Sequence, residues 1–109
     1  MGNMSAMHVD EKLLADVENY VKTHKVMIFS KSRCPHCIKV KDLFKSLGVD
    51  YHAIDLDVIE NGSAMQDAMA KKAGRRSVPQ VFINEEHVGG CDDTMAAHES
   101  GKLEALLKL

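Results

Sequence analysis

Two cysteines three positions apart, Cys34 and Cys37, are the residues whose spacing most clearly indicates chemistry. They follow a short apolar run, residues 26–29, which is typical of a strand covered on both faces. Apolar residues then recur at helical spacing, and Pro35 suits a first helical position because it has no N–H group to leave unpaired. Unpaired backbone N–H groups and the helix dipole favour a thiolate at such a helix start. The pattern therefore predicts a reactive thiol.

The charges beside the pair support this interpretation. Lys31, Arg33 and a protonated His36 would add positive charge that favours the anionic form of the sulfur. We expect Cys34 at the N-cap to be the attacking thiol. Cys37, one turn further inside the helix, is expected to be the resolving thiol.

A zinc site and a chance pair of buried cysteines are the alternatives. Zinc bound by Cys-x-x-Cys normally needs a second close pair of ligands, and the remaining cysteine and the histidines have no such spacing. We therefore expect no metal. The third cysteine, Cys91, is expected to be a small packing residue rather than a third redox group.

Length, composition and charge narrow the class of protein. A chain of 109 residues with 45% hydrophobic and 28% charged residues can form one domain with a single core. Its net charge of −2 provides no field that would attract nucleic acid. No apolar stretch approaches the roughly 20 residues that span a bilayer, so we expect no membrane partner.

The N-terminal residues lack the apolar segment of a signal peptide. We expect residues 1–9 to be a disordered tail or an expression remnant, and residues 10–109 to be the folded domain. An odd cysteine count without a secretory signal favours a reducing compartment, so we expect a cytoplasmic protein.

Apolar spacing and chain-breaking residues predict the elements that position the two cysteines. The predicted order is a helix at about 10–23, a strand at 26–29, a helix from 34 to about 48, a strand at 51–55, a helix ending at 74, a hairpin within 78–88 and a helix interrupted at 101. Ser63 and Gln66 match a capping box for the third helix. The turn of the hairpin is expected at Asn84-Glu85. This order predicts an α/β fold, a thioredoxin-like three-layer sandwich with a central mixed four-stranded sheet flanked by helices.

Three motifs together resemble those of a known family: Cys34-Pro35-His36-Cys37, Ser77-Val78-Pro79 and Gly89-Gly90-Cys91-Asp92-Asp93. In this order they resemble a dithiol glutaredoxin, over nearly everything from about residue 11 to the C-terminus. Thioredoxins differ in having Trp before the first cysteine, and this chain has no Trp. The resemblance implies a glutathione-dependent thiol–disulfide oxidoreductase that reduces protein–glutathione mixed disulfides and protein disulfides.

The resemblance also implies a glutathione-binding site. Pro79 would follow a cis peptide bond, and the backbone of Val78 would hold the cysteinyl part of glutathione. Cys91 and Asp92 would offer backbone N–H groups to the γ-glutamyl carboxylate, while Asp92 or Asp93 would bind its ammonium. An ordinary trans proline and plain N-capping by Asp92 are the alternatives.

Lys31 and Gln66 match family positions that contact the glycine carboxylate, although the capping box explains Gln66 without a ligand. Two residues depart from the family pattern, because His36 stands where Tyr is usual and Ser77 where Thr is usual. The His36 ring would line the groove and titrate near neutrality. We hypothesise that protonated His36 favours the Cys34 thiolate; the alternative is a surface ring without consequence.

By this resemblance glutathione is the co-substrate and no metal is expected. The partners would be glutathionylated or disulfide-bonded proteins, and the chain would be a monomer. One alternative is a dimer that binds a [2Fe–2S] cluster through the first cysteine of each subunit and two glutathiones. Pro35 disfavours it, because cluster-holding members commonly have a smaller residue there. A thioredoxin-like reductase would need no glutathione pocket, and Lys31 with Asp92-Asp93 disfavours that alternative.

Overall fold

The computed structural model describes residues 9–108, so most of the predicted tail lies outside the described residues. The elements are α1 (Glu11–Thr23), β1 (Val26–Ser30), α2 (Pro35–Ser46), β2 (His52–Asp55), α3 (Gly62–Ala73), β3 (Gln80–Ile83), β4 (Glu86–Gly89), α4 (Cys91–Ser100) and α5 (Lys102–Leu107). This is the order that the sequence predicts. Within residues 9–108, no helix combines the length and the apolar character needed to cross a membrane.

The four strands form one mixed sheet in the order β2-β1-β3-β4. β1 pairs in parallel with β2 and antiparallel with β3, and β3 continues into β4 as a hairpin. The hairpin turn lies at Asn84 and Glu85, as predicted, with φ of 50° and 69°. Two successive positive φ angles match the right-handed twist of the strands.

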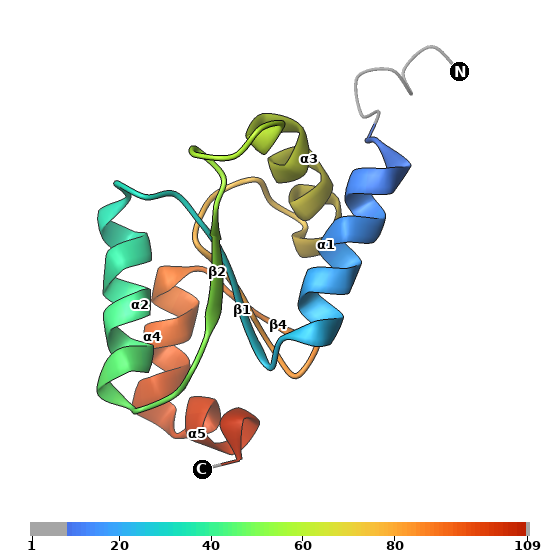
Figure 1. Cartoon of the computed structure of the whole chain (residues 1–109). Helices are drawn as coiled ribbons and strands as arrows, with labels where there is room; N and C mark the ends of the chain where they lie inside the picture. Colours follow the sequence, from blue (N-terminus) through green and yellow to red (C-terminus); the bar gives the residue numbers. More distant parts are fainter. Residues whose placement is uncertain (1–8, 109) are drawn as a thin grey trace.

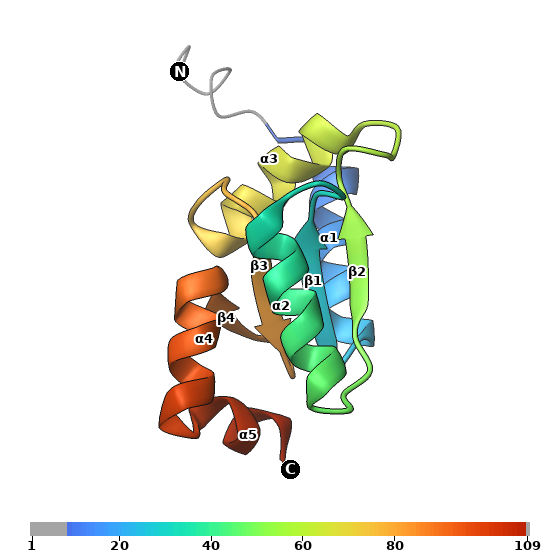
Figure 2. The same ribbon diagram turned by 90° about the vertical axis from the view of Figure 1, so that its left-hand side faces the viewer.

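Helices cover both faces of the sheet (Figures 1 and 2). Met27 and Phe29 of β1 point into the core that α1 and α3 cover. Val26 and Ile28 point into the opposite core, which α2, α4 and α5 cover. All of β1 is buried, as expected for a strand that is apolar at every position. The cysteine pair begins α2, just beyond the end of this central strand.

The predicted capping box of α3 is wrong. The helix begins at Gly62 after Asn61, and no side chain caps it. A Cβ atom on Gly62 would approach the Leu56 carbonyl carbon to 2.8 Å, so the helix starts where only glycine allows this close backbone contact. Ser63 therefore lies inside the first turn, and Gln66 is buried and donates instead to the Arg76 carbonyl oxygen at 2.8 Å.

Candidate active site

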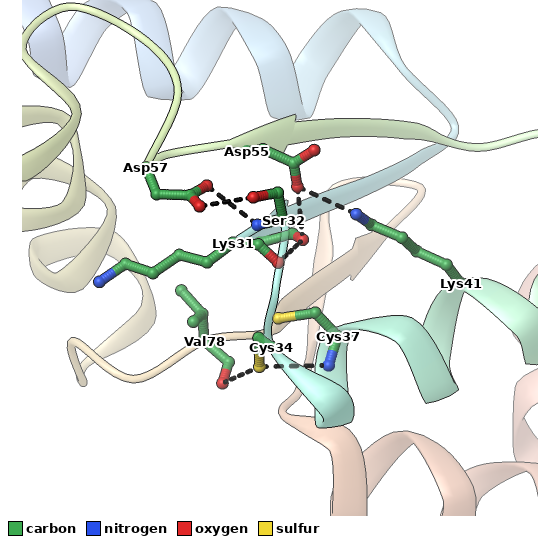
Figure 3. A network of polar contacts seen from close by, with 9 residues as sticks. Lys31, Ser32, Cys34, Cys37, Lys41, Asp55, Asp57 and Val78 are labelled. Carbon is green, nitrogen blue, oxygen red and sulfur yellow. Dashed lines mark hydrogen bonds and ion pairs between the residues drawn. The ribbon is translucent and has the colours of Figure 1, made fainter.

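Cys34 lies at the N-cap of α2, and Pro35 occupies the first turn, as the sequence predicts. The backbone N–H of Cys37 donates to the Cys34 sulfur at 3.3 Å (Figure 3). The Cys34 thiol also faces the carbonyl oxygen of Val78 at 4.0 Å. Because Cys34 is only partly buried and Cys37 is fully buried, a disulfide-containing substrate reaches the Cys34 sulfur first.

The buried position of Cys37 determines its protonation. Burial, together with the hydrogen bond to Cys34, raises the pKa of Cys37 to about 11. The Lys31 backbone N–H and the Ser30 hydroxyl offset part of this increase. At neutral pH, Cys37 is therefore a thiol and not a thiolate.

A carboxylate beyond β2 anchors the loop that leads to Cys34. Asp57 accepts hydrogen bonds from the Ser32 backbone N–H at 2.9 Å and from the Ser32 hydroxyl at 2.6 Å. These two bonds, with a smaller effect of the Lys31 charge, lower the pKa of Asp57. Figure 3 shows the Lys31 side chain extended on the Asp57 side of the loop and not toward Cys34.

A groove of about 310 Å³ opens beside the cysteine pair, between the start of α2, the loop before β3 and the start of α4. It is lined by His36, Arg75, Ser77, Val78, Pro79, Gly90, Cys91, Asp92 and Asp93. The peptide bond between Val78 and Pro79 is cis, as the family resemblance implies. The structure thus brings most of the predicted site residues around one groove.

Lys31 and Gln66 do not line this groove. Lys31 lies beside Asp57, and the Gln66 amide is bonded to Arg76. Arg75 does line it, and the sequence analysis missed this residue. The only local signal for Arg75 was its place in a basic pair shortly before the Val-Pro motif.

Asp93, not Asp92, caps α4, so the alternative of N-capping by Asp92 is wrong. Gly90 is the N-cap residue, and its N–H donates to the Asp93 carboxylate at 3.1 Å. Arg75 donates to the same carboxylate at 2.6 Å. The Gly90 hydrogen bond, followed by the Arg75 contact, lowers the pKa of Asp93. Asp92 occupies the second helical position, where its exposed side chain is not the cap.

Cys91 lines the groove but is itself largely buried, with 8% of its surface exposed. Burial is also the main cause that raises the pKa of Cys91. This environment is that of a packing residue rather than of a reactive thiol. Within residues 9–108, no group of three or more His, Cys, Asp and Glu side chains lies close enough together to hold a metal ion.

Comparisons with known proteins identify the family. The sequence model of the glutaredoxin family matches residues 26–88. Glutaredoxin-C6 from rice (Oryza sativa subsp. japonica) is 49% identical over 94 residues, which cover 86% of this chain and 84% of that protein. The chain belongs to the glutaredoxin family. It is therefore a thiol–disulfide oxidoreductase, and the cysteine pair at the start of α2 fits the dithiol active site of this class.

Solved structures agree with this assignment. The crystal structure of a wheat glutaredoxin superposes with a TM-score of 0.85 at 49% identity, covering 88% of this chain and 91% of that one. A buckwheat glutaredoxin–glutathione complex superposes with a TM-score of 0.87 at 40% identity, covering 90% and 89%. The predicted thioredoxin-like fold is thus confirmed.

Proposed function

We propose that this glutaredoxin uses glutathione as its co-substrate and Cys34 as its nucleophile. The observation that carries the proposal is the position of the Cys34 sulfur, which faces the Val78 carbonyl oxygen, while Val78 itself lines the groove. A backbone N–H and C=O beside a cis proline can pair with the cysteinyl part of a peptide such as glutathione. The related buckwheat structure is a complex with glutathione, which supports this choice of ligand.

The two ends of the groove offer charges that suit the γ-glutamyl group. α4 directs its N-terminal N–H groups toward the groove, where they favour a carboxylate. Asp93 is held by Arg75 and Gly90, so we assign the ammonium group of the ligand to the exposed carboxylate of Asp92. Lys31 would contact the glycine carboxylate after turning away from Asp57.

The proposed reaction begins when the Cys34 thiolate attacks the glutathione sulfur of a protein–glutathione mixed disulfide. A bond forms between Cys34 and glutathione, and the protein sulfur leaves with the electron pair of the broken bond and takes a proton from water. A second glutathione, as its thiolate, then attacks the adduct. This step releases oxidised glutathione and restores Cys34 as a thiolate.

Protein disulfides would follow a second route through Cys37. Here the Cys34 thiolate attacks the protein disulfide, which forms a mixed disulfide with one protein cysteine and releases the other as a thiolate. Cys37 then loses its proton to water and attacks the Cys34 sulfur, so the bound protein cysteine leaves as a thiolate and a Cys34–Cys37 disulfide remains. Two glutathiones reduce this disulfide and become oxidised glutathione. Potentials of roughly −200 to −230 mV, typical of this class, suit exchange with the cellular glutathione pool. We further propose that the protein acts as a monomer in the cytoplasm on glutathionylated and disulfide-bonded proteins.

A glutathione-coupled assay with a mixed-disulfide substrate tests the assignment. Cys34→Ser should lose turnover to the uncatalysed level, while Cys37→Ser should keep much of its deglutathionylating activity. Cys91→Ser serves as the control for loss of a thiol in the same groove and should stay active. Full turnover by Cys34→Ser would show that the nucleophile has been assigned wrongly.

A further inference from the structure

A buried glutamine follows the groove residues Ser77, Val78 and Pro79, and the reaction described above makes no use of it. This residue, Gln80, is the first of β3 and is fully buried. Its side-chain Nε2 lies 3.1 Å from the Ser77 carbonyl oxygen and 3.3 Å from the Ser77 hydroxyl oxygen. Its side-chain oxygen lies 2.7 Å from Nε2 of His87 on β4. Both polar ends of the buried amide are therefore paired.

The Ser77 carbonyl oxygen fixes the orientation of the Gln80 amide. A carbonyl oxygen can only accept a hydrogen bond, so the Gln80 atom that faces it must be the amide nitrogen. The amide oxygen then faces His87, whose ring must donate its Nε2 proton. Imidazole protonated at Nε2 and imidazolium both supply this proton. The hydrogen bonds therefore run in one direction, from His87 through Gln80 to Ser77.

The pairing of β3 with β4 sets the contact between His87 and Gln80. Gln80 and Phe82 are two residues apart on β3, so their side chains lie on the same face of the sheet. His87 is the register partner of Phe82, and the centroids of their two rings are 4.8 Å apart. The His87 ring thus packs on Phe82 while its Nε2 reaches the Gln80 amide. This contact follows from strand register and is part of the fold.

The Ser77 carbonyl belongs to the same peptide unit as the Val78 N–H. This unit is trans and planar, so its C=O and its N–H point in opposite directions. Since the Ser77 carbonyl points to the Gln80 amide, the Val78 N–H points away from it. Over the part of the chain that the structure describes, no backbone oxygen accepts a hydrogen bond from this N–H. Val78 lines the groove, so its N–H is a donor free for a ligand.

The Val78 carbonyl oxygen, on the other side of the same residue, faces the Cys34 sulfur (Figure 3). A peptide joined to Cys34 through a disulfide would therefore meet both polar groups of the Val78 backbone. We propose that Gln80, held by His87, is a positioning residue that presents the Val78 N–H to the peptide backbone of the glutathionyl group. This inference rests on the proposed function and adds to it the side chains that orient the groove.

Other hydrogen bonds hold the two residues before this peptide unit. The Arg76 carbonyl oxygen accepts a hydrogen bond from Gln66 of α3 at 2.8 Å. The Arg75 guanidinium donates to Asp93 of α4. Loss of the glutamine bonds should therefore let the next peptide unit turn while the rest of the loop stays in place. We expect the effect to fall on recognition of the ligand backbone.

The test compares two disulfides of one cysteine-containing peptide, the first with glutathione and the second with 2-mercaptoethanol. In the Cys37→Ser background, the Cys34 thiolate attacks the small thiol's sulfur, forms a disulfide with it and releases the peptide as a thiolate. The rate of this release gives a second-order rate constant for each substrate. Both constants depend on the reactivity of Cys34, but only the glutathione disulfide has a backbone that can accept from the Val78 N–H. Their ratio therefore measures recognition by the groove.

Gln80→Met keeps a long unbranched side chain and removes both hydrogen-bonding ends of the amide. It should lower the ratio roughly three- to tenfold, the loss expected for one hydrogen bond to the ligand. Lys25→Met is the matched control, because Lys25 donates to the Leu107 carbonyl oxygen at 2.7 Å and precedes β1, whereas Cys34 follows it. It should leave the ratio unchanged. An unchanged ratio in Gln80→Met, or an equal fall in Lys25→Met, would overturn the proposal.

His87→Phe provides a second variant in case Gln80→Met folds poorly. His87 is exposed on β4, and phenylalanine keeps an aromatic ring beside Phe82. The substitution leaves the Gln80 side-chain oxygen without its donor, so the amide is free to turn. The ratio should fall at least about twofold. The parent's ratio in His87→Phe would contradict the chain of hydrogen bonds on which the proposal depends.

The parent chain separates a failure of this inference from a failure of the proposed function. If the parent attacks both disulfides at equal rates, it does not recognise glutathione, and the proposed function and the inference fail together. If the parent prefers the glutathione disulfide and Gln80→Met keeps the same preference, only the inference fails. NMR hydrogen exchange of the Gln80 side-chain amide gives a readout without glutathione. Exchange should be slow in the parent and faster in His87→Phe, and equally fast exchange in both would overturn the proposal.

Discussion

Gly89, the last residue of β4, offers a sharp test of how the groove is built. Its φ is +124°, and a Cβ atom there would lie 2.7 Å from the Asp93 Cβ and 2.8 Å from the Asp93 Cγ. Such contacts essentially do not occur in proteins. In Gly89→Ala, Asp93 must therefore move away, and its bonds to Gly90 and Arg75 are lost with it.

The expected loss of stability has two parts. An L-residue in this sparsely populated backbone region costs about 1–3 kcal/mol. Loss of the helix cap on α4 adds about 1 kcal/mol. Since 1 kcal/mol shifts the melting temperature of a domain of this size by about 4–8 °C, Gly89→Ala should lower it by on the order of 10–30 °C. Arg75 adds little to this sum, because surface ion pairs are weak.

Thermal unfolding followed by circular dichroism measures this effect, with Gly48→Ala as the matched control. Gly48 has a φ of +70°, and a Cβ atom there would meet nothing within 4 Å. Gly48→Ala should therefore lower the free energy of unfolding only by the backbone strain, about 1–2 kcal/mol. Gly89→Ala should also raise KM for glutathione, because the start of α4 shifts, while Gly48→Ala leaves KM unchanged. Equal melting temperatures and equal KM values for the two variants would refute this account of the groove.

Two further predictions concern histidines. His52 is partly buried and stacks on His24 with a centroid distance of 4.0 Å; burial first, and then the His24 charge, lower the pKa of His52. Below about pH 6.5 the unfolded chain therefore binds more protons than the folded protein, so the free energy of unfolding should fall from pH 7 to pH 5. In His52→Gln, the melting temperature should fall less over the same pH range. His36 lines the groove beside the cysteine pair. If its protonated ring favours the Cys34 thiolate, His36→Tyr should move the pH profile of Cys34 alkylation to higher pH, and identical profiles would contradict the hypothesis.

The sequence by itself determined the elements and the position of the cysteine pair. The apolar run of β1, the N-cap at Cys34 and the turn at Asn84 all depend on residues that are close neighbours along the chain. Helix and strand periods then fix which side chains share a face, so the position of Cys34 at the N-cap and of Cys37 further inside the helix could be predicted from local patterns. The family motifs added residues of the groove that spacing alone would not have joined.

Only the tertiary structure decided which distant residues meet. Gln66 donates a hydrogen bond to Arg76 in the loop after α3 and does not cap a helix. The reason is that the close Leu56 backbone fixes the start of α3 at Gly62. The contact between Ser30 and Asp55 depends on sheet register, and that between Arg75 and Asp93 on how the loop before β3 approaches α4. Local propensity acts over a few residues, whereas these contacts join segments that are brought together only when both faces of the sheet are packed.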